Sequence, residues 1–128
     1  ARFASYHPNG RVLVLDYPTF PAIVETGLIS ASFWEEHTQI YFRDGWVSID
    51  TPPPLLRNVS AEVEVYRAGK TQSYLKPLAD YDWSFKRSAE HFIDCIINDH
   101  ESRTSGRDSM VDIELIEDAF VDLAKRDH

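Results

Sequence analysis

The sequence predicts an α+β fold, with an open, mostly antiparallel β-sheet and two C-terminal helices packed on one face of it. Two observations lead to this prediction. Apolar and polar residues alternate with a period of two through much of residues 12–75, whereas beyond residue 84 the apolar residues recur every three or four positions. Strands that come first and helices that come last are typical of an antiparallel sheet covered on one face. The 128 residues, 43% of them hydrophobic, are expected to form a single domain, residues 1–128.

The first strands are expected at residues 12–17 and 28–33. Residues 12–17 are apolar on both alternating faces, as in a strand well inside a sheet, and residues 28–33 alternate more regularly. A hairpin is expected at residues 39–50, because Asp44-Gly45 suits the positive φ angles of a two-residue type I′ turn. A second hairpin is expected from residues 59–66 and 71–75.

The expected turn at Asp44-Gly45 assigns the side chains of the first hairpin to two faces. It pairs Arg43 with Trp46 and Tyr41 with Ser48, so that these side chains share one face. The opposite face is wholly apolar and is expected to meet the helices in the core; its members are Ile40, Phe42, Val47 and Ile49. Between the hairpins, Pro52-Pro53-Pro54 removes three backbone donors and is expected to leave the sheet as a rigid connector, or to serve as a ligand for a proline-reading domain.

Two amphipathic helices are expected at about residues 84–99 and 109–125. Their apolar stripes are Phe85, Ala89, Phe92, Ile93, Ile96 and Ile97 on the first helix and Val111, Leu115, Ile116, Ala119, Phe120 and Leu123 on the second. The polar linker 101–107 separates them, and Asp108 or Ser109 can cap the second helix.

Composition excludes several classes of partner. A formal net charge of −8 works against nucleic-acid binding, which depends on Lys and Arg to displace counterions from phosphates. The sequence has no leader and no run of about 18 apolar residues, so neither export nor a membrane span is predicted. The single cysteine, Cys95, cannot form an internal disulfide, which indicates the reducing cytoplasm. The chain starts at Ala1 without an initiator Met, and we therefore expect it to be a piece of a longer protein.

The sequence carries no recognisable catalytic or cofactor motif. The five histidines never fall three or four apart on one helix, so no metal site is predicted. His91 and Cys95 lie four apart and could form a thiolate–imidazole pair, but the apolar segment around Cys95 favours a small core residue. The five glycines are isolated and form no phosphate-binding loop, so no cofactor is expected to bind this chain itself.

Three segments in order resemble a known family signature. They are residues 88–99 (SAEHFIDCIIND), residues 104–110 (TSGRDSM) and residues 113–120 (IELIEDAF). Together with the hairpin segment 39–50 (QIYFRDGWVSID), they resemble the C-terminal domain of the glucose-fructose oxidoreductase and inositol 2-dehydrogenase (Gfo/Idh/MocA) family. The resemblance covers essentially the whole chain.

The resemblance implies the C-terminal half of a two-domain oxidoreductase that acts on a sugar or polyol. In that family a preceding Rossmann domain, absent from this sequence, binds NAD or NADP. The family's catalytic Lys belongs to a Glu-Lys-Pro motif in that domain, whereas here Leu75 precedes Lys76-Pro77. No catalytic residue is therefore assigned to this chain, which is expected to be inactive by itself.

Two groups of residues are expected to contact other molecules, one group the substrate and the other a second copy of the chain. Trp34, His37 and Trp83 lie near strand ends or the passage into the first helix, and aromatic and imidazole groups suit the faces and hydroxyls of a sugar. Tyr41, Arg43, Trp46 and Tyr66 are expected to form a homo-oligomer interface on the open sheet face, since Tyr, Trp and Arg are enriched in interfaces. The alternative is a stand-alone module with a curved sheet that binds a small ligand or serves assembly alone.

Overall fold

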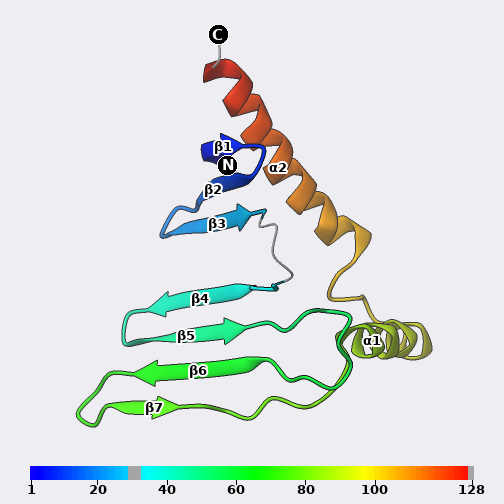
Figure 1. Cartoon of the computed structure of the whole chain (residues 1–128). Coiled ribbons are helices and arrows are strands. Elements are labelled where there is room, and N and C mark those ends of the chain that lie inside the picture. Colours follow the sequence, from blue (N-terminus) through cyan, green and yellow to red (C-terminus); the bar gives the residue numbers. More distant parts are fainter. Residues whose placement is uncertain (29–32, 127–128) are drawn as a thin grey trace. The chain divides into compact units, whose positions relative to one another are not determined.

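The computed structural model describes residues 1–28 and 33–126 and has the predicted α+β class (Figure 1). Its strands form two open antiparallel sheets, of three and four strands, where the sequence indicated one broad sheet. Two helices follow in the C-terminal third. By their internal contacts the residues fall into two compact units, Ala1–Ala31 with Glu101–His128 and Ser32–His100, and each is described by itself.

The first unit contains the sheet β1-β2-β3, formed by β1 (Arg2–His7), β2 (Gly10–Asp16) and β3 (Pro21–Gly27). The strand expected at residues 12–17 is β2, and its central place in this sheet agrees with its two apolar faces. Strands β1 and β3 were not predicted. Of the strand expected at residues 28–33, residues 29–32 lie outside the described residues, while Leu28 and Phe33 belong to no strand.

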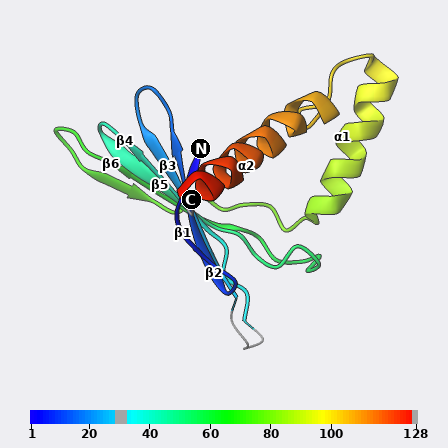
Figure 2. The same cartoon turned by 90° about the horizontal axis from the view of Figure 1, so that it is seen from above.

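Helix α2 (Gly106–Arg126) packs against β1 in this unit. Ala119 is fully buried there, which lets the helix approach the strand closely, and Figure 2 shows the C-terminal end of α2 over β1. The Phe120 ring meets those of Phe3 and Tyr6 edge to face, at centroid distances of 5.1 and 5.7 Å. Arg126 Nη1 donates a hydrogen bond of 2.8 Å to the Phe3 carbonyl oxygen and so fixes the last turn of the helix.

The second unit contains the sheet β4-β5-β6-β7, in which every strand pairs with the next one along the chain. Its strands are β4 (His37–Phe42), β5 (Gly45–Asp50), β6 (Glu62–Arg67) and β7 (Ser73–Leu75). Both predicted hairpins are therefore confirmed. The alternation of Glu and Val over residues 62–65 explains why β6 could be recognised, and the Asp44-Gly45 dipeptide explains why the first hairpin could be recognised.

The predicted turn of the first hairpin is wrong by one residue. Phe42 pairs with Gly45, so the two turn residues are Arg43 and Asp44, and Tyr41 lies opposite Trp46 rather than Ser48. Gly45 belongs to the ladder, and glycine is required there because a Cβ atom would overlap the Tyr66 carbonyl oxygen of the neighbouring strand. Trp46 and Ser48 lie on the same face of β5, so the predicted composition of each face is largely retained.

Helix α1 (Ser84–Asn98) begins at a small network of polar side chains. Asp82 accepts a hydrogen bond from the Trp83 backbone N–H at 2.9 Å and pairs with Lys86 and Arg87. These contacts, hydrogen bonds to Arg87 first, lower the pKa of Asp82. The helix ends at Asp99, whose φ of 51° is left-handed and whose N–H bonds the Cys95 carbonyl oxygen.

The apolar stripes of the two helices are only partly covered. On α2, Ala119 is buried and Leu115 and Leu123 are half-buried, in agreement with the predicted stripe, but Val111, Ile116 and Phe120 remain exposed. Among the described residues of α1, only Cys95 is buried. All six members of the predicted α1 stripe are exposed, so the expectation that this stripe lies in a core is not met; they are Phe85, Ala89, Phe92, Ile93, Ile96 and Ile97.

Candidate functional site

Four aromatic side chains cross the β4–β7 sheet in one row. Tyr41 pairs with Trp46, Trp46 with Tyr66, and Tyr66 with Tyr74, so that each strand contributes one ring to the same face. The Trp46 ring is offset-stacked with Tyr66 and edge-on to Tyr74, both at centroid distances of 6.1 Å. Tyr41 is 78% exposed and Tyr74 52% exposed. We call these four residues the aromatic row.

A polar network borders the aromatic row. Lys76 Nζ lies 2.5 Å from Glu64 Oε1 and 5.9 Å from the centre of the Tyr74 ring. Hydrogen bonds from Lys76 and then Tyr74 lower the pKa of Glu64, whereas the bond to Glu64 raises the pKa of both Lys76 and Tyr74. These shifts favour a protonated Lys76 and a neutral Tyr74 at physiological pH. Neither group is thereby activated as a base or nucleophile.

The structure brings together three of the four residues predicted for the oligomer interface. Tyr41, Trp46 and Tyr66 are neighbours in the aromatic row, whereas Arg43 lies in the turn and is not part of the row. The prediction for Arg43 depended on the misplaced turn. Tyr74 was missed, although the pairing of a strand at residues 71–75 with β6 would have placed it beside Tyr66.

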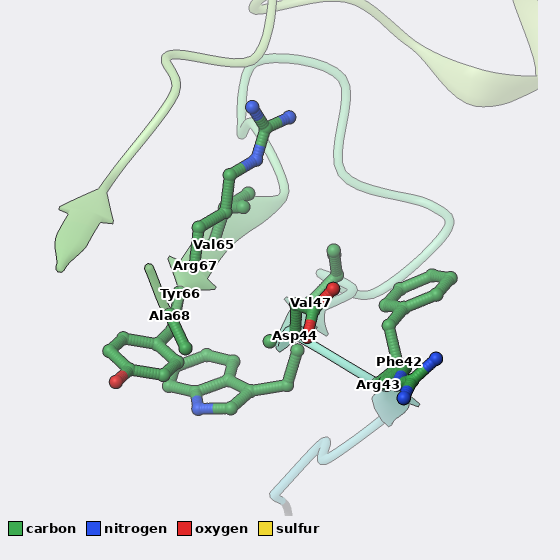
Figure 3. Close-up of a pocket in the computed structure, with 10 residues that line it drawn as sticks. Phe42, Arg43, Asp44, Val47, Val65, Tyr66, Arg67 and Ala68 are labelled. Atoms are coloured by element: carbon green, nitrogen blue, oxygen red, sulfur yellow. The ribbon is translucent and has the colours of Figure 1, made fainter. Parts of the chain in front are cut away.

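A hollow of about 600 Å³ lies beside the Arg43-Asp44 turn (Figure 3). Gly45 pairs with Phe42 on one side and with Arg67 on the other, and it has no side chain to fill the space between them. Figure 3 shows the side chains of Phe42 and Arg67 on either side of Val47. The hollow is mainly apolar, with the guanidinium groups of Arg43 and Arg67 among its lining side chains.

Two of the three residues predicted to contact substrate lie near one another. A second hollow, of about 370 Å³, is lined by Trp34 and Asp50 at the open end of the first hairpin. His37 lies directly opposite Asp50 in the ladder, and its Nδ1 is 2.7 Å from Asp50 Oδ1. The hydrogen bond to Asp50 is the main cause of a raised pKa at His37.

Trp83 takes part in a different arrangement. Its indole Nε1 donates a hydrogen bond of 3.1 Å to the Pro54 carbonyl oxygen, and the Arg57 guanidinium lies 4.7 Å from the centre of its ring. The Leu56 N–H also bonds the Pro53 carbonyl oxygen at 3.0 Å, which closes a turn in the proline-rich connector. Trp83 therefore joins this connector to the start of α1. No contact recorded among the described residues joins it to Trp34 or His37.

His91 and Cys95 form a close pair on α1, with Cys95 Sγ 3.6 Å from His91 Nε2. Cys95 is only 7% exposed, which agrees with a core role for this small side chain. Within residues 1–28 and 33–126, no three His, Cys, Asp or Glu side chains are grouped in a way that could hold a metal ion. In the same part of the chain, neither helix combines the length and apolar character needed to cross a membrane.

Comparisons of the chain with models of protein families, with curated proteins and with solved structures found no match.

Proposed function

We propose that the chain is the substrate-side and self-association domain of an NAD(P)-dependent oxidoreductase that acts on a sugar or polyol. In this proposal a Rossmann domain elsewhere in the enzyme binds the nicotinamide and supplies the catalytic Lys. The lack of any glycine-rich phosphate loop in the sequence supports this division of roles.

The observation that carries the proposal is where the family-like segments fall in the fold. Residues 39–50 form the hairpin of β4 and β5, and residues 88–99 lie almost wholly in α1. Of residues 104–110, only 104 and 105 precede α2 while 106–110 form its start, and residues 113–120 lie within the same helix. The hairpin segment therefore lies in a hairpin, and the segments 88–99 and 113–120 lie in helices, in the order that the resemblance implies, whereas most of the expected loop at 104–110 is helical.

The aromatic row supports the self-association part of the proposal. Its rings lie on an open sheet face, bordered by the ion pair of Glu64 and Lys76. Tyr and Trp are enriched in interfaces, where their large rings bury much apolar area at a low cost in conformational entropy. A second copy of the chain is the occupant that we propose for this face, with Tyr41, Trp46 and Tyr66 at its centre.

A stand-alone binding module is the second candidate function. The hollow beside Gly45 favours it, because Phe42 and Arg67 together offer an apolar wall and a positive charge to a small ligand. This candidate needs no cofactor domain and no dehydrogenase activity. The two candidates therefore differ in whether the complete gene product binds nicotinamide.

Calorimetric titration with NADH and NADPH separates these candidates. We expect the complete gene product to bind one of the two cofactors with micromolar affinity, and the chain of residues 1–128 to release no heat with either. If the complete gene product bound neither cofactor, the oxidoreductase proposal would be wrong. Stoichiometric binding of NADH by the chain alone would refute the proposed division of roles.

A further inference from the structure

The hollow beside Gly45 lies on the sheet face opposite the aromatic row. Phe42, Gly45 and Arg67 pair across three neighbouring strands and share one face, to which the glycine contributes no side chain. Val47 and Val65 pair two residues further along on the same face; both are half-buried and form the apolar lining between the other two side chains. The backbone of β6 leaves no room for a Cβ atom at Gly45, so no larger residue can close the space of about 600 Å³.

The two guanidinium groups at the hollow have no carboxylate partner. Both Arg43 and Arg67 are exposed, and neither takes part in an ion pair within residues 1–28 and 33–126. By contrast, Arg2, Arg87 and Arg126 each pair with an aspartate. The hollow therefore offers a ligand positive charge that the described part of the chain does not neutralise by pairing.

The charge at the hollow is opposite in sign to that of the chain. Its lining side chains include two guanidinium groups and one carboxylate, that of Asp44, whereas the whole chain has a formal net charge of −8. A large polyanion would also meet the acidic remainder of the chain and be repelled by it. A small anion can approach the guanidinium groups alone, so the charges favour a small anionic ligand over a nucleic acid.

The arrangement of the side chains favours one negative charge on an apolar body. Figure 3 shows Arg43 beside Phe42 and Arg67 on the other side of Val47, so the two guanidinium groups do not converge on one point. A single guanidinium can hold a carboxylate through two parallel hydrogen bonds. The Phe42 ring is 61% exposed and offers its face to an apolar group that lies over Val47. The volume of the hollow is within the range typical of small-molecule sites.

We infer that this hollow binds a small organic monocarboxylate with an apolar body, whose carboxylate meets Arg67 and whose body lies against Phe42. The site is separate from the aromatic row and from the candidate substrate contacts Trp34 and His37, so it goes beyond the oxidoreductase proposal. It gives the second candidate function a class of ligand, and in that respect the inference rests on that candidate.

The test is an NMR titration of the chain of residues 1–128 that follows the amide signals of Gly45, Val47 and Val65. The probes are 3-phenylpropionate, 3-phenylpropan-1-ol, which has the same apolar body without the charge, and acetate, which has the charge without the body. We expect 3-phenylpropionate to shift these signals, and the alcohol and acetate each to bind at least about tenfold more weakly. If 3-phenylpropionate caused no shift at millimolar concentration, or if either other probe bound as tightly, the inference would be overturned.

Variants at two arginines test the role of the charge. Arg67→Gln should weaken binding of 3-phenylpropionate at least about tenfold, because the carboxylate loses its charged partner. Arg107→Gln makes the same change in net charge at an exposed residue of α2 and should leave the affinity unchanged. An unchanged affinity in Arg67→Gln, with a native amide spectrum, would contradict the assignment. Because these readouts use neither nicotinamide nor the oligomer mass, their failure is distinguishable from failure of the oxidoreductase proposal.

Discussion

Replacing Gly45 with alanine is expected to lower the free energy of unfolding of the β4–β7 sheet by about 3 kcal/mol. An added Cβ atom would overlap the Tyr66 carbonyl oxygen and lie 3.0 Å from its carbonyl carbon. Both atoms belong to the backbone of β6, so no side-chain rotation can relieve the overlap. The ladder between β5 and β6 has to open locally, and the stacking of Trp46 on Tyr66 is disturbed with it.

Urea unfolding followed by tryptophan fluorescence measures this loss. Gly69→Ala is the matched control, because the nearest atom to its added Cβ would be the Thr71 carbonyl oxygen at 3.6 Å, an ordinary contact. We expect the control to change the free energy of unfolding by less than about 0.5 kcal/mol. Equal stability of the two variants would show that β6 does not approach Gly45 as described.

Trp46→Glu is expected to dissociate the proposed oligomer while leaving the chain folded. The Trp46 side chain lies on the aromatic face of the sheet and is only half-buried within the chain. A carboxylate there can be hydrated in the isolated chain but would be buried and unpaired between two aromatic rows, which costs several kcal/mol. Light scattering should give the mass of a dimer or larger assembly for the unmodified chain and about half that mass or less for the variant.

Leu55→Glu is the control for this experiment. It adds the same charge at a residue that is 78% exposed in the proline-rich connector, away from the aromatic row. This variant should keep the oligomer mass, and circular dichroism should show native secondary structure for both variants. A monomeric parent at high micromolar concentration would refute self-association through this face.

The elements that the sequence predicted well have either a clear hydrophobic period or a recognisable turn. Strand β6 alternates Glu and Val over residues 62–65, and both helices have apolar residues at helical spacing. Strands β4 and β5 were recognised from the Asp44-Gly45 dipeptide between them instead. Strand β3 was missed because Ile23 and Val24, adjacent in sequence, point to opposite faces and both remain exposed. Without one buried face, a strand has no alternating pattern to recognise.

Strand β1 could have been found from its turn. His7 pairs with Gly10 across Pro8-Asn9, in the same way that Phe42 pairs with Gly45 across Arg43-Asp44. In both hairpins the glycine is the first residue of the second strand rather than a turn residue. The sequence shows a glycine at each of these positions. At Gly45 the reason for it is the close approach of β6, a strand about 20 residues further along the chain, and this contact cannot be read from the sequence near the turn.

The candidate site was only partly visible in the sequence. Once two hairpins were recognised, strand pairing was sufficient to place Tyr66 and Trp46 on one face, and the same reasoning extends to Tyr74. The pairing of His37 with Asp50 needed the exact register, because the turn expected at Asp44-Gly45 places Gln39, two residues away, opposite Asp50. The contact of Trp83 with Pro54 depends on the path of an irregular connector, for which no periodic pattern exists.

The most direct test of the proposed substrate-side role is the Michaelis constant of the complete gene product for its sugar or polyol. Alanine in place of Trp34, His37 or Trp83 should raise that constant. The largest effects are expected at Trp34, which lines the hollow at the open end of the first hairpin, and at His37, which bonds Asp50 of that lining. The thermal unfolding temperature should stay close to that of the unmodified enzyme for the Trp34 and His37 variants, whose side chains are exposed. Trp83→Ala should lower it, because Trp83 is half-buried and its indole N–H bonds the Pro54 carbonyl oxygen. Unchanged kinetics in all three variants would contradict the assignment of substrate contacts to this domain.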